Sequence, residues 1–363
     1  MMKDRRRLII LIFMALLSIA ALIVVQFLPS KNPEQNFSLK LRAALLMQES
    51  MKVIYDARIS QDIPVDLEND PNKTGLIGPE YSEFTTTLGP LEVKRTTTNP
   101  DFAAVIVQLL QEAGVKKGDL VAAGISGSFP GLALALFSAA EVMELDLAAI
   151  SSVGASTFGA THPLLTWLDM ETLLFQAGLI SKGSSAASVG GDDDQLKNPF
   201  FPGASEMALE AIRRNGVHVI ARDTLEEAME TRVDFYMKQA GDRRFSAFIN
   251  IGGAEVNLGT GDAGYSLPSG VIKKAIRNPK RNEGIIFRMA EEGIPVINLL
   301  NVRDLCLRYG LPVDPVPLPT PGNEGIYYIR ESSLLPLLVL LILSIAIGIL
   351  IWTDKKIMHG GRG

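Results

Sequence analysis

Two long apolar runs lie near the ends of this chain of 363 residues, at 8–28 and at 334–352. Neither run contains a charged side chain. At about 1.5 Å per helical residue, both are long enough to cross a bilayer core of about 30 Å. The residues after the first run offer no small-residue cleavage site of the kind that ends a signal peptide. Both runs are therefore predicted to be transmembrane helices, the first an uncleaved anchor.

The stretch between the two runs alternates between helical and strand patterns. Apolar residues at helical spacing predict helices at 102–114, 131–144, 206–216, 224–241 and 287–293. Short continuous apolar runs predict strands at 119–126, 145–154, 217–223, 245–253 and 294–300. Such continuous runs are typical of strands buried on both faces. The expected fold class is α/β, a mostly parallel, doubly wound sheet with helices on both faces, flanked by one transmembrane helix at each end.

The pattern divides the chain into seven parts. They are a basic tail at 1–7, a transmembrane helix at 8–28, a juxtamembrane helix with an irregular lead-in at 29–100, an α/β domain at 101–310, a proline-rich connector at 311–333, a transmembrane helix at 334–352 and a tail at 353–363. The connector has the composition of a semi-rigid spacer.

Charge fixes the expected orientation. Both tails are basic, and basic residues next to a membrane helix favour the cytoplasmic side. The termini are therefore predicted to be cytoplasmic and the main domain extracytoplasmic, at the cell (inner or cytoplasmic) membrane. Without the tails, the chain keeps 28 basic and 38 acidic residues, a net charge of −10. A domain this acidic is not expected to bind nucleic acid, and any anion must be held at a local site.

Glycine and serine gather where the predicted strands end. In an open α/β sheet, ligands bind beyond the carboxyl ends of the strands, and helix-start N–H groups favour anions. "GISGSFPG" at 124–131 is such an end, and "SSVGAST" at 151–157 and "NIGGAEVNLGTG" at 250–261 share its chemistry. These loops fit neither a P-loop nor a dinucleotide fingerprint. The candidate ligand-binding residues are Gly124, Gly127, Ser151, Ser152, Ser156, Gly190, Gly191, Gly252, Gly253 and Glu255; simple packing of helices against strand ends is the alternative.

Three motifs carry a resemblance to a known family. "GISGSFPG", "SSVGASTFGATHPLLTWLDME" and "SAASVGGDDD", in this order between two terminal apolar runs, resemble the poly-γ-glutamate system protein family. The resemblance implies a membrane-tethered component of poly-γ-glutamate synthesis and export. It implies a membrane, an anionic polymer and other subunits of that apparatus as partners. It names a pathway and implies no particular reaction.

Nucleophilic catalysis has two serine candidates, Ser126 and Ser128. "GISGS" does not match a nucleophile elbow, which places a glycine two residues after the serine. A serine hydroxyl also needs a base to take its proton at neutral pH. His162, on a loop after a strand end, and Lys182 are the candidate bases.

Acidic residues form the last candidate site. Asp169 and Glu171 are two apart on a predicted helix, so only one faces the crevice; Asp169 is the choice, with Glu171 solvated or capping. Asp192, Asp193 and Asp194 follow two glycines and offer oxygen ligands for Mg²⁺ or Ca²⁺. A solvated acidic turn explains the same three residues. Few histidines and a single cysteine argue against zinc.

Two functions of different class therefore remain open. The outer domain either binds carboxylates of poly-γ-glutamate at its Gly- and Ser-rich strand ends, or it is a hydrolase or transferase that acts on the polymer. Binding follows more directly from the residues. A serine, a base and N–H donors within hydrogen-bond reach of one another would favour catalysis.

Overall fold

The computed structural model describes residues 12–16, 18–20, 32–34, 36–197, 199–273, 284–329, 338–339, 341–347 and 349. The chain forms two compact units, one made of Met1–Glu34 with Tyr328–Gly363, the other of Gln35–Tyr327. The second unit therefore includes most of the predicted lead-in and most of the predicted connector, in addition to 101–310.

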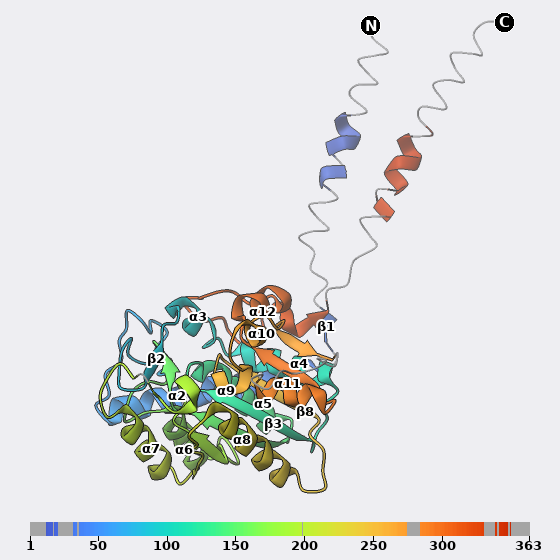
Figure 1. Ribbon diagram of the computed structural model, residues 1–363. Coiled ribbons are helices and arrows are strands. Elements are labelled where there is room, and N and C mark those ends of the chain that lie inside the picture. The colour runs from blue at the N-terminus through green and yellow to red at the C-terminus, as the bar shows by residue number, and fades with distance from the viewer. Residues whose placement is uncertain are drawn as a thin grey trace, which may run out of the picture. The chain divides into compact units, whose positions relative to one another are not determined.

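A seven-stranded sheet forms the centre of the second unit (Figure 1). Its order is β7 (His218–Val219), β6 (Ala186–Ser188), β4 (Asp146–Ser152), β3 (Leu120–Ser126), β8 (Ala247–Ile251), β10 (Val296–Leu299) and β9 (Gly270–Ile272). All described pairings are parallel except β9 with β10. The chain winds outward from β3 in both directions, so the order reverses between β3 and β8. The predicted doubly wound sheet is confirmed.

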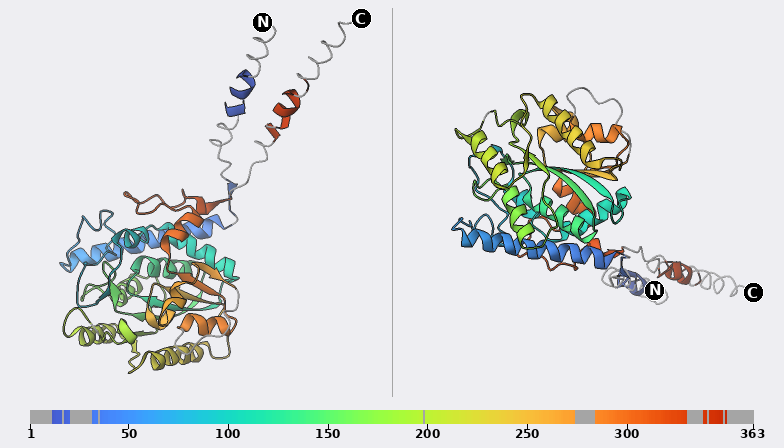
Figure 2. Two further views of the ribbon diagram at one scale, coloured as in Figure 1. Left: turned by 45° about the horizontal axis from the view of Figure 1, so that its top comes forward. Right: turned by 90° about the horizontal axis from the view of Figure 1, so that it is seen from below.

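Helices cover both faces of the sheet. They are α2 (Phe37–Ser60), α3 (Leu91–Thr96), α4 (Asp101–Ala113), α5 (Pro130–Val142), α6 (Trp167–Gln176), α7 (Ala204–Arg214), α8 (Leu225–Ala240), α9 (Glu255–Leu258), α10 (Asp262–Tyr265), α11 (Ile285–Glu291) and α12 (Val302–Tyr309). On one face, apolar residues of α8, α9 and α11 form a core cluster with alternate residues of the strands, among them Ala122, Ile150 and Phe248. On the other, α4 and α5 lie between the sheet and α2 (Figure 2).

Local sequence explains several of these elements. The predicted helix at 102–114 is confirmed as α4, which ends at Gly114 in the left-handed conformation that glycine tolerates best. Every residue of β3 is buried, which is why its sequence is continuously apolar. Proline at the first turn of α5 fits the helix because its missing N–H would have no partner there.

Other elements were not evident from the pattern. The predicted strand at 217–223 is reduced to two residues. The antiparallel edge strand β9 was not predicted from the sequence. The helix of the lead-in is confirmed as α2, and it is part of the core: Ala43, Ala44, Met47, Met51 and Ile54, spaced along one face, are all buried. Thr85–Thr87 forms β2, which pairs with β5 (Ala155–Ser156). The lead-in therefore helps to build the candidate site.

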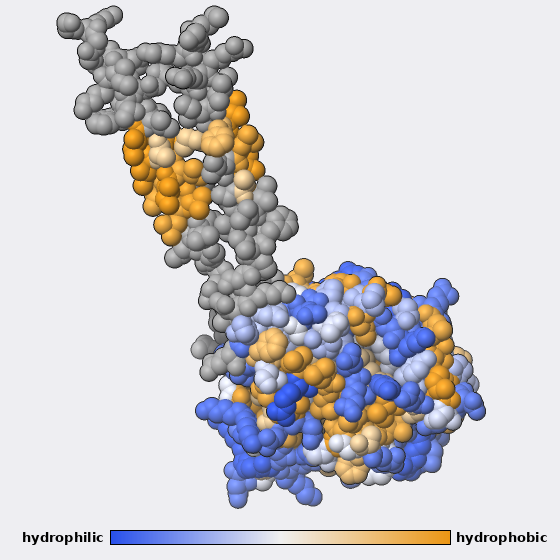
Figure 3. Space-filling model, turned by 180° about the vertical axis from the view of Figure 1, so that it is seen from behind, coloured by the Kyte–Doolittle hydropathy of each residue, from blue (hydrophilic) through white to orange (hydrophobic). Residues whose placement is uncertain are grey.

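The first unit is described in part. β1 (Asn32–Pro33) pairs antiparallel with β11 (Tyr328–Ile329). Residues 12–16, 18–20, 338–339 and 341–347 are helical, and their apolar side chains are largely exposed (Figure 3). Among the described residues, no helix combines the length and apolar character needed to span a bilayer. Much of the predicted spans 8–28 and 334–352, and the tails 1–7 and 353–363, lie outside the described residues.

Candidate functional site

Three serines line the carboxyl edge of the sheet on one face. Ser126, Ser152 and Ser188 end β3, β4 and β6, and they are paired in register from strand to strand. All three are buried. The glycine-containing loops that follow these strands, and the loop after β8, therefore meet at the same edge, on both sides of the point where the strand order reverses. The structure therefore brings the candidate loops together at one edge of the sheet.

Backbone N–H groups in these loops donate within the protein. Gly127 N donates to Ser152 O at 3.0 Å, and Ser128 N donates to Ser126 Oγ at 3.2 Å. Asp193 N donates to Glu255 Oε2 at 2.8 Å. A carboxylate arriving at these amides must therefore compete with serine and glutamate oxygens of the chain itself.

The glycines have different roles. A Cβ on Gly127 would lie 2.7 Å from Val153 O, and one on Gly190 would lie 2.9 Å from Ser152 Cβ. These two glycines, and Gly124 against the Asn257 side chain, are required for close packing. A Cβ on Gly253 would meet only side-chain atoms at 3.5–3.8 Å, which is ordinary contact. Of these glycines, Gly253 is the one with room beside it.

A chain of hydroxyl groups links the loops after β3 and β4. Ser126 Oγ donates to Ser128 Oγ at 2.9 Å, and Ser128 Oγ accepts from Ser156 N at 2.9 Å. The sequence therefore identified serines that do meet. The amine that reaches them belongs to a residue that the sequence analysis did not select.

Lys94, in α3, reaches this chain of serines. Its Nζ donates to Ser128 O and to Ser156 Oγ, both at 2.5 Å, and it lies 3.9 Å from the centroid of the Phe129 ring. Its side chain is 2 % exposed, and burial lowers its pKa to about 7. No local pattern in "LEVKRT" marks this lysine, because its burial depends on loops 30 to 60 residues away.

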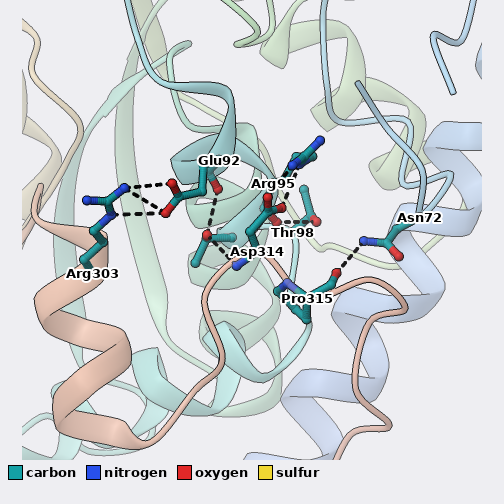
Figure 4. A network of polar contacts seen from close by, with 8 residues as sticks. Asn72, Glu92, Arg95, Thr98, Arg303, Asp314 and Pro315 are labelled. Atoms are coloured by element: carbon teal, nitrogen blue, oxygen red, sulfur yellow. Dashed lines mark hydrogen bonds and ion pairs between the residues drawn. The ribbon is translucent and has the colours of Figure 1, made fainter. Parts of the chain in front are cut away.

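Two residues of α3 that flank Lys94 in the sequence, Glu92 and Arg95, form ion pairs with segments outside α3 (Figure 4). Arg303, in α12, donates to the Glu92 carboxylate through Nε and Nη2 in three hydrogen bonds. Arg95 donates through Nε and Nη2 to the carboxylate of Asp314 in the proline-rich connector. Asp314 N also donates to Thr96 Oγ1 at 3.0 Å. Contacts far apart in sequence thus set the position of the lysine.

A buried arginine lies behind the serines of β4 and β6. Arg232, in α8, donates through Nη2 to Ser152 Oγ at 3.0 Å and to Ser188 Oγ at 2.5 Å. The same Nη2 is 3.0 Å from Asp194 Oδ1. Arg232 is a second residue that the sequence analysis missed. Its signal was a charge within the apolar stripe of α8, where Ala228, Met229 and Tyr236 are buried.

The acidic loop serves these internal contacts. Asp194 is buried and pairs with Arg232, so its carboxylate is not a solvated metal ligand. Asp193 pairs with Lys197 at 2.5 Å, and the loop's short helical turn spans Asp192–Asp194. In the described ranges, no group of three or more His, Cys, Asp or Glu side chains is arranged to hold a metal ion.

Asp169 was predicted to face the crevice and Glu171 to be solvated or to cap the helix, but Asp169 is the capping residue and Glu171 is buried. Asp169 caps α6 in a capping box with Thr166 and forms an ion pair with Arg214, so it faces away from a crevice. Glu171 is the buried one: it accepts from Ser184 N and Ser184 Oγ, both at 2.7 Å. Burial raises its pKa to about 7. The capping box fixes which of the two carboxylates turns inward.

The buried carboxyl group of Glu171 and the hydroxyl group of Ser126 lie on opposite faces of the sheet. Ser184 Oγ is 2.7 Å from Ser151 Oγ, and Ser151 alternates with Ser152 along β4. Ser151 therefore belongs to a hydrogen-bonded group with Glu171, and Ser152 to the group with Arg232. The two adjacent serines, both predicted to bind ligand, point to different faces of the sheet.

Neither predicted base is placed beside a predicted nucleophile. Lys182 pairs with Asp146, the first residue of β4, and so lies at the amino edge of the sheet, opposite Ser126. His162 Nδ1 accepts from Leu164 N within its own loop, and burial lowers its pKa. The amine within hydrogen-bond distance of a serine hydroxyl is that of Lys94 instead.

Comparison of the chain with protein-family models, with curated proteins and with solved structures finds no match.

Proposed function

We propose that this chain is a membrane-anchored, extracytoplasmic component of a poly-γ-glutamate biosynthesis or export apparatus. In this proposal, 8–28 and 334–352 are the membrane helices and both termini are cytoplasmic. The α/β domain binds carboxylates of the polymer at the Gly- and Ser-rich carboxyl edge of its sheet. The support from sequence is the set of three motifs that resemble the poly-γ-glutamate system family, together with the basic tails.

One structural observation carries the binding part of the proposal. The loops of two of the motifs meet the loop after β8 at the switch point between β3 and β8, where open α/β sheets bind their ligands. Gly252 lies against Ser126 and Phe129, since a Cβ on it would be 3.1 Å from both side chains. The next residue, Gly253, has room beside it and accepts a hydrogen bond from Tyr265 at its carbonyl.

The chemistry of this edge suits a chain of γ-linked glutamate units. Tyr265 is 54 % exposed, so its aromatic ring is available to the methylene groups of the polymer, and Phe129 is partly exposed. The polymer carboxylates compete with the oxygens of Ser126, Ser152 and Glu255 for the loop N–H groups. Bulk attraction does not contribute, because the stretch between the tails carries a net charge of −10.

The test is titration of the full-length chain with γ-glutamate oligomers between 0.05 and 1 M salt. Repulsion between like-charged bodies is screened as salt rises, whereas hydrogen bonds in a partly buried crevice are screened much less. Affinity is expected to hold steady or to increase with salt. Gly253→Leu, which fills the space beside Gly253, is expected to lower affinity at least tenfold. Ala221→Leu, an exposed substitution after β7, is the matched control.

Three results separate the alternatives. A steep loss of affinity with salt would show a basic binding surface in place of this edge. Loss of binding with chelator, restored by Mg²⁺ or Ca²⁺, would assign the carboxylates to a cation bridge. Absence of binding at every salt concentration, by a chain that is folded, would refute the proposal.

A second candidate function, a hydrolase or transferase that acts on the polymer, is favoured by one observation: Lys94 Nζ and Ser156 Oγ are 2.5 Å apart.

A further inference from the structure

We propose that Ser156 and Lys94 form a nucleophile and base pair, and that the α/β domain uses it to cleave or transfer an acyl group from an amide or ester. That poly-γ-glutamate supplies this amide rests on the proposed function. The inference goes beyond it by assigning a reaction and two residues.

The geometry of the pair allows proton transfer between Ser156 Oγ and Lys94 Nζ. Lys94 Nζ and Ser156 Oγ are within hydrogen-bond distance, and Ser128 O holds the same Nζ from another side. Ser–Lys pairs are one of the recurring variants of the serine nucleophile with a base. Ser126 and Ser128 hydrogen-bond to each other, and neither hydroxyl contacts Lys94 in the structure, so Ser156 is the serine with a base.

The environment favours the neutral amine that a base requires. Lys94 is 2 % exposed, no ion pair with a carboxylate is described for it, and burial holds its pKa at about 7. A neutral amine keeps two N–H groups and one lone pair. It can therefore donate to Ser128 O while it accepts the proton of Ser156 Oγ.

The reaction balances with water as the co-reactant. Ser156 Oγ attacks the carbonyl carbon, a C–O bond forms, and the hydroxyl proton moves to Lys94 Nζ. The C–N or C–O bond of the substrate breaks, and the ammonium returns that proton to the leaving amine or alcohol. Water then attacks the acyl–Ser156 ester, giving one proton to Lys94 and releasing the acid. The proton returns to Ser156 Oγ, which restores the starting state.

Access to the Ser156 hydroxyl group depends on Gly89, which has no side chain to cover it. Ser156 is 7 % exposed, and Gly89, which is partly exposed, lies over it. A Cβ on Gly89 would be 2.8 Å from Ser156 Oγ and 3.2 Å from Lys94 Cε. Any larger residue at position 89 would therefore cover the pair.

Labelling with a fluorophosphonate, a probe that reacts with activated serines, tests the pair in the full-length chain. Peptide mapping is expected to find the probe on Ser156, with a labelling rate that rises with pH around a midpoint of about 7. Lys94→Met is expected to lower the rate at least tenfold, and Lys94→Arg not to rescue it, because a guanidinium does not lose its proton. Ser138→Ala, which removes another buried serine, is the control.

Ser156→Ala keeps the inference falsifiable if the Lys94 variants do not fold, since it removes a single oxygen. Labelling of wild type at Ser156 that Ser156→Ala abolishes supports the pair. No labelling of folded wild type at pH 8, or labelling at another serine, refutes it.

Polymer chain length separates the two proposals. Shortening of poly-γ-glutamate by wild type but not by Ser156→Ala supports both. Binding without shortening or labelling refutes the Ser156–Lys94 pair and leaves the binding function intact. Labelling of Ser156 without polymer binding supports the pair for another substrate and refutes the binding function.

Discussion

Arg232 and Asp194 form an ion pair that is closed to solvent: Nη2 lies 3.0 Å from Oδ1 and 3.0 Å from Oδ2, and the arginine side chain has no exposed surface. The pair joins α8 to the acidic loop. Ser152 and Ser188 accept from the same nitrogen, so the ends of β4 and β6 depend on it. In the described part of the chain, Nε and Nη1 of Arg232 have no hydrogen-bond partner.

Asp194→Ala is expected to lower the free energy of unfolding by about 3–5 kcal/mol, because it leaves a buried guanidinium without its counter-charge. Urea denaturation of the full-length chain measures this. Asp193→Ala, one residue earlier and paired with Lys197 at an exposed position, should cost less than about 1 kcal/mol. The double variant Asp194→Leu with Arg232→Met should lose less than Asp194→Ala. Equal losses at 193 and 194 would contradict the structural role of this pair.

Glu171→Gln is expected to change how stability depends on pH. Burial raises the folded-state pKa of Glu171 from 4.5 to about 7, so the folded state binds more protons than the unfolded state between these values. Wild type therefore loses stability as pH rises from about 4.5 to about 7, by on the order of 3 kcal/mol from this one group. The variant, which does not titrate, should lack that loss.

Unfolding curves at pH 4.5, 6 and 8 measure the effect. Asp146→Asn serves as the control: the hydrogen bond from Lys182 lowers the pKa of Asp146 from 3.8, so the stability that it provides is lost only below that pH. The difference between wild type and Asp146→Asn should therefore stay constant from pH 4.5 to pH 8. If the difference between wild type and Glu171→Gln were the same at all three pH values, Glu171 would not hold its proton as the structure indicates.

The sheet and its glycine- and serine-rich carboxyl edge were predictable because they depend on local pattern. Strands buried on both faces leave continuous apolar runs, and β3, β4, β8 and β10 all show them. Loops after parallel strands meet at one edge whatever the details of packing. The serines and glycines of that edge could therefore be placed without knowing which helix covers which face.

The partners of those serines were not predictable, because distant segments supply them. Lys94 comes from the lead-in, which the pattern marked as irregular, and β2 brings that segment beside Ser156. Asp169 and Glu171 were assigned the wrong way round because the cap formed by Thr166 sets the rotation of α6. In each case the sequence shows which chemical group the residue carries. The direction in which its side chain points depends on tertiary contacts, which the local sequence does not reveal.

Asp314→Asn is expected to free the proline-rich connector, and Arg303→Ala is not. The Arg95–Asp314 side chains are 23 % and 18 % exposed, whereas those of Arg303 and Glu92 are 61 % and 39 % exposed. A charge-assisted bidentate pair that is largely shielded contributes about 1.5–3 kcal/mol, and an exposed pair about 0–1 kcal/mol. Asparagine keeps the shape of the residue and tolerates its positive φ of 48°, so the substitution removes mainly the charge.

Cleavage by proteinase K within 311–323 reports this release, because a bound connector must open before it is cut. A loss of about 1.4 kcal/mol raises the open population about tenfold, and the cleavage rate follows when closing is faster than cutting. Asp314→Asn should therefore be cut roughly tenfold faster than wild type, and Arg303→Ala less than about fivefold faster. Asn72 Nδ2, which donates to Pro315 O at 2.9 Å, supplies a second and neutral contact, so Asn72→Ala should fall between them. Equal cleavage of all three variants would show that the connector is held by packing, and that the ion pair on α3 does not restrain it.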